Sequence, residues 1–247
     1  MFQNNNYFKR PSRVGGMATP LGVYLTTGNL RAGAGDLGLF LTGVIMTVFY
    51  IFIFQIIDIS FNIFPVLADD TSVGLFIDIL ILFLFLFFLR LSPLAGYHAA
   101  EHQTINAMEN NLDLNLYIVS RMQRFHPRCG SNLVALFVSA QIIIVILTPL
   151  FWGDFSLLLI TFIALVYLTW RPLGRIVQLF FTTKKPNNNQ LLSGIKAGEE
   201  ILKKYNLNPY YKAPFLKKIW NMGLLQVIGG WFITFFIVYL IDLLIGQ

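Results

Sequence analysis

The sequence predicts an all-α membrane protein, a polytopic bundle of about five transmembrane helices with a cytoplasmic N-terminus. Hydrophobic residues make up 56% of the 247 residues and charged residues only 12%, which is about half the charged share of a typical soluble domain. Apolar runs recur that are long enough to cross a bilayer, for which ~20 residues are needed. The basic residues, finally, are confined to alternate segments between those runs.

Five apolar runs qualify as spans, approximately residues 37–61, 73–91, 132–150, 155–170 and 224–245. The third and fourth runs are separated only by a short turn around Gly153, so we expect them to form a helical hairpin. We therefore divide the membrane part into helices 1–2 within residues 37–92, a hairpin of helices 3–4 within 132–171, and helix 5 within 220–247.

Charge predicts the orientation of these helices. All 18 Lys and Arg residues precede the first run, fall from Arg90 at the end of the second run to the start of the third, or fall from Arg171 to Lys218. The opposite loops contain Asp69, Asp70 and Asp154 but neither Lys nor Arg. Because basic loops remain in the cytoplasm during insertion, the pattern predicts an N-terminus inside and a C-terminus outside.

The three segments on the basic side differ in character. Residues 1–36 are rich in glycine, and we expect them to be irregular. Residues 93–131 carry the reactive side chains and form the predicted interfacial metal-site segment. Residues 172–219 are basic and contain an amphipathic pattern from about Gln190 to Tyr205. Lysines surround its apolar stripe, a combination that suits a helix lying on an anionic membrane surface.

The first reactive block is the run from His98 through Glu101 to His102. Residues three and four apart share one face of a helix, so these three side chains are expected to point the same way. Two imidazoles at that spacing can chelate a transition metal such as zinc. The same spelling, H-x-x-E-H, occurs in metalloproteases whose glutamate acts as general base.

The second block runs from His126 to Gly130 and includes the only cysteine, Cys129. Pro127 and Gly130 favour a turn, in which His126 and Cys129 can face one ion. A single interfacial histidine more often only forms hydrogen bonds, so the prediction depends on the cluster as a whole. A divalent metal is expected, with zinc as the first choice. Three ligands with a bound water would make a catalytic site and four a structural one, and both remain open.

A family resemblance appears at these residues. Residues 96–109 followed by 124–131 resemble the YqhQ-type family, bacterial membrane proteins of unknown function that are also described as predicted metal-dependent enzymes. The similarity continues through Thr182-Thr183, Pro186 and Gln190-Leu191. Small departures, such as Ala99 in place of the usual glycine, remove no candidate ligand. The resemblance implies metal ligands at His98, His102, His126 and Cys129, with Glu101 and Glu109 as acid/base groups or further ligands.

These observations predict a membrane-embedded, metal-dependent enzyme, a hydrolase whose site lies at the cytoplasmic membrane interface. A lipid, a lipid-linked compound or a segment of a membrane protein could reach such a site. The alternative is a non-enzymatic scaffold or assembly factor with a closed structural metal site. A transporter is a third interpretation, for which Asp78 supplies a charge within a span.

The expected partner is the lipid bilayer, with an anionic lipid or a membrane-protein substrate as further candidates. A homo-oligomer or a larger membrane complex is left open. Nucleic acid is not expected, because the basic excess follows the topology and no nucleic-acid motif accompanies it. The membrane is either a bacterial plasma membrane or a thylakoid or plastid membrane, with the metal site on the cytoplasmic or stromal side.

Overall fold

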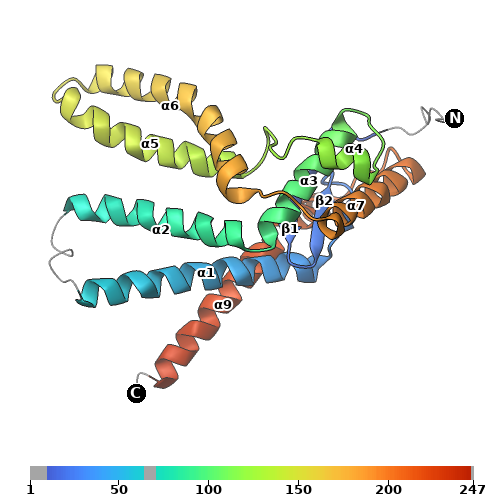
Figure 1. Ribbon diagram of the computed structural model, residues 1–247, viewed down its shortest axis with the longest axis horizontal. Coiled ribbons are helices and arrows are strands. Elements are labelled where there is room, and N and C mark those ends of the chain that lie inside the picture. Colours follow the sequence, from blue (N-terminus) through green and yellow to red (C-terminus); the bar gives the residue numbers. More distant parts are fainter. Residues whose placement is uncertain (1–9, 64–70, 246–247) are drawn as a thin grey trace.

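The computed structural model describes residues 10–63 and 71–245. It consists of a head and a set of long helices that extend from the head in one general direction (Figure 1). The head contains a small sheet together with the helices α3 (Leu94–Glu109), α4 (Leu116–Arg121) and α7 (Asn188–Leu207). The long helices are α1 (Asp36–Ile63), α2 (Thr71–Leu91), α5 (Ser131–Leu150), α6 (Phe155–Val177) and α9 (Leu224–Ile245).

Four of the long helices have the length and apolar character needed to cross a membrane: α1, α5, α6 with its extension to Thr182, and α9. The helix α2 meets α3 at a bend of 76°, and this pair passes the same test only when taken together, which raises the count to five. The predicted helical, polytopic fold is confirmed. The cytoplasmic position of the N-terminus stays a prediction, and the loop with Asp69 and Asp70 lies outside the described residues.

The predicted hairpin of the third and fourth spans is present as α5 and α6, which pack along each other. Asp154 caps α6, because its carboxylate accepts a hydrogen bond from the backbone N–H of Leu157 at 2.9 Å. The helix α6 runs past the predicted end of the span and widens into a short π-helix, η2 (Gln178–Thr182). This extension brings polar residues from the end of α6 to the head.

The N-terminal segment differs from the expectation of an irregular chain. Of its residues 1–36, those from 10 onward are described, and they include an antiparallel sheet in the order β1-β2-β3. The strands are β1 (Gly15–Thr19), β2 (Gly22–Thr26) and β3 (Arg31–Gly33). Val23 and Leu25 of the central strand are fully buried. The strands form because this small apolar face packs against α3 and α7.

The helix α7 begins at a capping box, in which Asn187 and Gln190 each accept a hydrogen bond from the other's backbone N–H. Its apolar residues Leu191, Ile195 and Ile201 are buried in the core of the head. The apolar stripe therefore faces the sheet and α3, not a membrane surface as its pattern suggested. Lys203 and other lysines beyond that stripe are exposed, so their contact with anionic lipid stays a prediction.

The head and the long helices are connected at the crossing of α1 and α9. A Cβ atom added to Gly43 would lie 2.0 Å from the carbonyl oxygen of Val227, and one added to Gly230 would lie 2.0 Å from that of Phe40. The two backbones therefore touch. The short helix α8 (Phe215–Asn221) leads into α9, and the hydroxyl of Tyr24 in the sheet donates to the carbonyl oxygen of Asn221 at 2.7 Å.

Candidate metal centre

The candidate centre is built on α3, which is buried around most of its circumference. One face packs against α7, where Gly194 lies so close to α3 that an added Cβ would be 2.5 Å from the hydroxyl of Thr104. Another face packs against β1 and β2. Because α3 is held from several sides, the side chains on its remaining face have fixed positions.

Three of the predicted ligands converge. One ring nitrogen each of His98 and His102 and the Sγ atom of Cys129 all lie within 4.8 Å of one another. The Nε2 atom of His98 is 3.2 Å from Cys129 Sγ, and the two imidazole rings are 4.3 Å apart between centroids. Donor atoms on one tetrahedral zinc lie roughly 3.5 Å apart, so small side-chain movements would let these three share an ion.

The other nitrogen of each imidazole is fixed by a backbone carbonyl. His98 Nδ1 lies 2.9 Å from the carbonyl oxygen of Thr182, and His102 Nδ1 lies 2.7 Å from that of Arg124. A carbonyl oxygen only accepts hydrogen bonds, so Nδ1 carries the proton in both rings and Nε2 keeps its lone pair. This arrangement is typical of histidines that bind metal through Nε2.

Cys129 lies in the predicted turn just before α5. Its Sγ atom accepts a hydrogen bond from the hydroxyl of Ser131 at 3.1 Å. Burial raises the pKa of the Cys129 thiol, while the contact with Ser131 lowers it. Burial also holds the pKa of His102 well below its usual range, so this imidazole is neutral at pH 7, the form that binds metal.

Glu101 lies beside the three ligands and is 5% exposed. Burial raises the pKa of Glu101 to about 8, against the opposing effect of His98. Its stem packs against β1, since a Cβ added to Gly16 would be 2.8 Å from Glu101 Cγ. The structure thus brings the predicted general base and three predicted ligands to one place.

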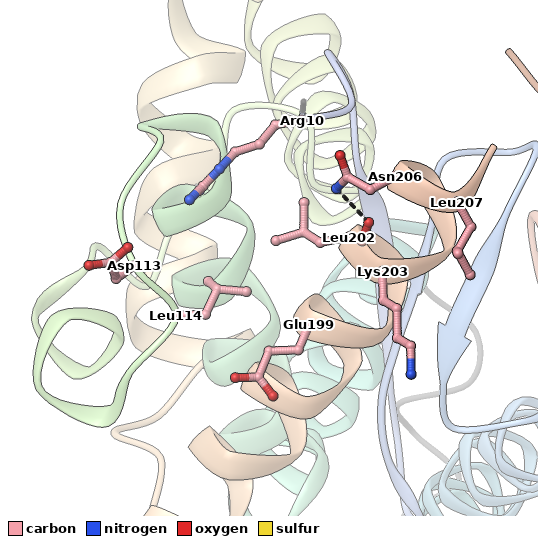
Figure 2. Close-up of a pocket in the computed structure, with 8 residues that line it drawn as sticks. All are labelled: Arg10, Asp113, Leu114, Glu199, Leu202, Lys203, Asn206 and Leu207. Atoms are coloured by element: carbon pink, nitrogen blue, oxygen red, sulfur yellow. Dashed lines mark hydrogen bonds between the residues drawn. The ribbon is translucent and has the colours of Figure 1, made fainter. Parts of the chain in front are cut away.

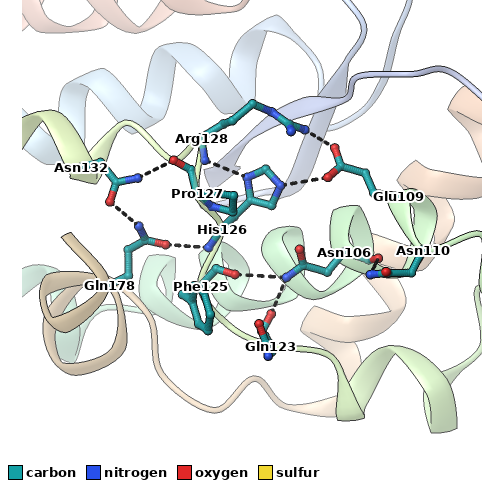
Figure 3. Close-up of polar contacts among 10 residues, drawn as sticks. All are labelled: Asn106, Glu109, Asn110, Gln123, Phe125, His126, Pro127, Arg128, Asn132 and Gln178. Atoms are coloured by element: carbon teal, nitrogen blue, oxygen red, sulfur yellow. Dashed lines mark hydrogen bonds and ion pairs between the residues drawn. The ribbon is translucent and has the colours of Figure 1, made fainter. Parts of the chain in front are cut away.

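His126 and Glu109 form a separate network (Figure 3). The Nδ1 atom of His126 accepts from the backbone N–H of Arg128 at 3.3 Å, and its Nε2 atom lies 3.2 Å from a carboxylate oxygen of Glu109. Glu109 also pairs with the guanidinium of Arg128. Burial lowers the pKa of His126, and Glu109 raises it. Within the described part of the chain, His126 is therefore outside the group of converging ligand atoms.

Two buried amides support this network, and sequence reasoning missed both. The side-chain oxygen of Gln178 accepts from the backbone N–H of His126, and its nitrogen donates to Asn132, both at 2.8 Å. Asn132 in turn donates to the carbonyl oxygen of Pro127 at 2.8 Å. Asn132 begins the third apolar run, and Gln178 is the one polar residue among apolar neighbours at positions 176–181, so both positions could have indicated a buried partner.

A cavity of about 460 Å³ contains the candidate centre. His98, Glu101, His102 and Cys129 line it together with β1, and His126 and Arg128 of the neighbouring network also reach it. Apolar residues of α1, α2, α5 and α9 form much of the remaining wall: Met46, Phe85, Leu86, Leu89, Val134 and Val227. We call it the central cavity. A second cavity, of about 520 Å³, lies between α7 and the segment after α3 (Figure 2). Its lining, which includes Arg10, Asp113 and Glu199, has neither histidine nor cysteine, so the central cavity is the candidate site.

Comparison with known proteins gives a family without an assigned activity. The model of the family described as "Protein of unknown function (DUF1385)" matches residues 31–204, which include all six predicted site residues. The "Uncharacterized protein YqhQ" of Bacillus subtilis is 24% identical over 208 residues. That match covers 72% of this chain and 65% of the relative, less than two thirds of its length. No solved structure matches the chain.

Proposed function

Because the chain belongs to the DUF1385 family, whose function is unknown, we propose a function from the site itself: a membrane-embedded, metal-dependent hydrolase. One observation carries the proposal. Two imidazole nitrogens that carry no proton and one sulfur converge within 4.8 Å, and a buried carboxyl, Glu101, lines the same cavity. Ligands and a general base in one pocket are the parts that metal-assisted hydrolysis needs.

We assign the roles as follows. His98, His102 and Cys129 hold a divalent cation, with zinc favoured by two nitrogen donors and one sulfur donor. The bound ion supplies Lewis acidity for a scissile carbonyl or phosphoryl group and lowers the pKa of water toward about 7. Glu101, whose pKa burial raises to about 8, accepts the proton of the attacking water in its ionised form, which a cation held beside it would favour. Glu109 orients His126 and Arg128 and takes no part in binding the ion.

The donor set supports an open site over the closed site of a scaffold protein. Structural zinc sites have four protein ligands, whereas catalytic sites have three and leave one position for water or substrate. The fourth predicted ligand, His126, has both ring nitrogens in contact with Arg128 and Glu109. It would have to give up one of these contacts in order to bind the ion.

We infer that the head lies on the cytoplasmic or stromal side of its membrane. The long helices meet the head at the ends that adjoin the basic segments of the chain. Basic segments remain on the cytoplasmic side when a membrane protein is inserted. The central cavity then lies at the membrane interface, between the head and the first turns of the spans.

Metal content tests the proposal with a matched control. The protein is purified in detergent, saturated with zinc, freed of excess ion and analysed by mass spectrometry. We expect about one zinc per chain in the wild type and a loss of at least about fivefold in His98→Gln and His102→Gln, since each removes a nitrogen ligand. His126→Gln is the control and should keep its zinc. Less than about 0.2 zinc per folded wild-type chain, or equal losses in all three variants, would refute the assignment.

A further inference from the structure

The strand β1 is an edge strand within the described part of the chain, and its outward backbone groups can be identified. Ala18 pairs opposite Val23, and Gly16 pairs opposite Leu25. The backbone of Val23 faces away from β1, because its carbonyl accepts from Ala34 N–H at 2.9 Å and its own N–H donates to Ser193. When two residues lie directly opposite each other in an antiparallel pair, their backbone N–H and C=O groups either both point toward the neighbouring strand or both point away from it. Gly16 and Ala18 therefore direct their N–H and C=O groups away from β2.

These outward groups are largely without partners. The carbonyl of Ala18 accepts from the hydroxyl of Thr42 at the long distance of 3.4 Å. No hydrogen bond joins Gly16 N–H, Gly16 C=O or Ala18 N–H to another group in residues 10–63 and 71–245. A row of alternating free donors and acceptors along an edge is a template for one more extended chain.

The free edge lies where a substrate would have to bind. All four residues of β1 from Gly15 to Ala18 line the central cavity, together with His98, Glu101, His102 and Cys129. At Gly16 the strand approaches Glu101 so closely that an added Cβ would be 2.8 Å from its Cγ atom. A chain paired with β1 would therefore run past the general base and the proposed ion.

We infer that the substrate of this hydrolase is a polypeptide segment that binds in extended form as an added strand on the outer edge of β1. The inference rests on the proposed function and specifies its substrate class and its scissile bond, a peptide bond. Backbone pairing supplies affinity in such complexes, and pockets for alternate side chains supply specificity. The apolar wall of the central cavity, with Leu86 and Val134, suits apolar side chains from a segment close to the membrane.

The reaction balances with water as the only co-substrate. The water oxygen forms a bond to the peptide carbonyl carbon, and the bond between that carbon and the amide nitrogen breaks. Glu101 takes a proton from the water and passes it to the departing nitrogen, which leaves a carboxylic acid and an amine. A lipid could also fill an apolar cavity, but its chains have neither donors nor acceptors to match the free edge, so the observations favour a peptide.

Three small probes separate strand addition from metal binding. The probes are an apolar tripeptide hydroxamate, the same compound with N-methylated backbone amides, and acetohydroxamate, all of which present one chelating group. With the zinc-loaded full chain in detergent, we expect the tripeptide to bind at least about tenfold more tightly than acetohydroxamate. N-methylation should abolish this advantage, and only the unmethylated tripeptide should slow deuterium exchange in residues 14–19.

A pair of variants at one position tests the edge itself. Ala18→Pro removes the outward N–H, which the β1–β2 pairing does not use, and proline is tolerated on an edge strand in that orientation. Ala18→Gly keeps the N–H. We expect Ala18→Pro to bind zinc normally but to lose the tripeptide's roughly tenfold advantage, and Ala18→Gly to retain it.

The outcomes distinguish the two proposals. If zinc does not bind, the proposed function fails. If zinc binds but the tripeptide hydroxamate neither outperforms acetohydroxamate nor protects residues 14–19, the inference about β1 is wrong and the metal site stands. Release of fatty acid from dioleoylphosphatidylglycerol vesicles by the zinc-loaded protein, prevented in Glu101→Gln, would overturn the peptide in favour of a lipid.

Discussion

At the scale of single residues, the three histidines differ in what their ring nitrogens contact. His98 and His102 each donate from Nδ1 to a backbone carbonyl, so both Nε2 atoms carry a lone pair, and that of His98 faces Cys129 Sγ. His126 has a backbone N–H on one nitrogen and Glu109 on the other. The same residue type thus has two roles, and the hydrogen-bond partner decides which one.

This difference predicts the behaviour of Glu109→Gln. The carboxylate contacts His126 and Arg128. Because the side chain of Arg128 is 46% exposed, the charge pair is screened by solvent and contributes at most about 1 kcal/mol to stability. We expect zinc content equal to that of the wild type and a fall in unfolding free energy of no more than about 1 kcal/mol. Mass spectrometry and thermal unfolding measure the two quantities. A severalfold loss of zinc would instead make Glu109 a ligand or a direct support of one.

At the scale of elements, α7 holds α3 in place from the side opposite the cavity. Its capping box fixes where it begins, and Gln190 of that box also donates to the carbonyl oxygen of Pro93, immediately before α3, at 3.1 Å. Gly194 and Gly198 then allow α7 to approach α3 and the loop at Leu114 closely. The start of α7 is thereby linked to the start of α3, and α3 carries the candidate ligands His98 and His102.

Removing the cap should destabilise the head. Asn187→Ala deletes the side-chain acceptor for Gln190 N–H, and such a change costs about 0.5–2 kcal/mol. Asn189→Ala, two residues on, is the control, because Asn189 is exposed and is not the capping residue. We expect its effect to be within about 0.5 kcal/mol. Thermal unfolding of both variants in the same detergent measures the loss of stability in each. Equal losses would contradict a structural role for the cap.

At the scale of the whole molecule, the head is connected to the long helices through the start of α1 and the start of α9 (Figure 1). The sheet leads directly into α1, and α9 returns to cross α1 at Gly43 and Gly230. The amide of Gln226 in α9 donates to Asp36 at the start of α1 at 3.0 Å. Val227 of α9 also lines the central cavity, so this crossing positions part of the site's wall.

Two adjacent glycines test the importance of that crossing. Gly230→Ala would place a methyl group 2.0 Å from the backbone oxygen of Phe40, so the helices must separate, at a cost of roughly 1–3 kcal/mol. At Gly229 an added Cβ meets nothing within 4 Å, so Gly229→Ala should be neutral or slightly stabilising. Unfolding in detergent measures both. Similar stabilities for the two variants would show that the contact does not hold the helices together.

The sequence was most informative where one local property decides the structure. Runs of apolar residues predicted the long helices, because a span is defined by its length and composition. The spacing of His98 and His102 predicted that they share a face, because helical geometry places residues four apart together. A run from Val23 to Thr26 between glycines could also have indicated a strand, but the glycine content of the segment led us to expect irregular structure.

Sequence alone therefore determined the helical membrane fold and the pairing of His98 with His102. The tertiary structure decided that Cys129 joins them while His126 turns to Glu109, that the stripe of α7 faces the protein, and that the edge of β1 lines the cavity. Each of these depends on contacts between segments far apart in the chain. Such contacts are set by the packing of whole elements against one another, which local composition and spacing do not encode.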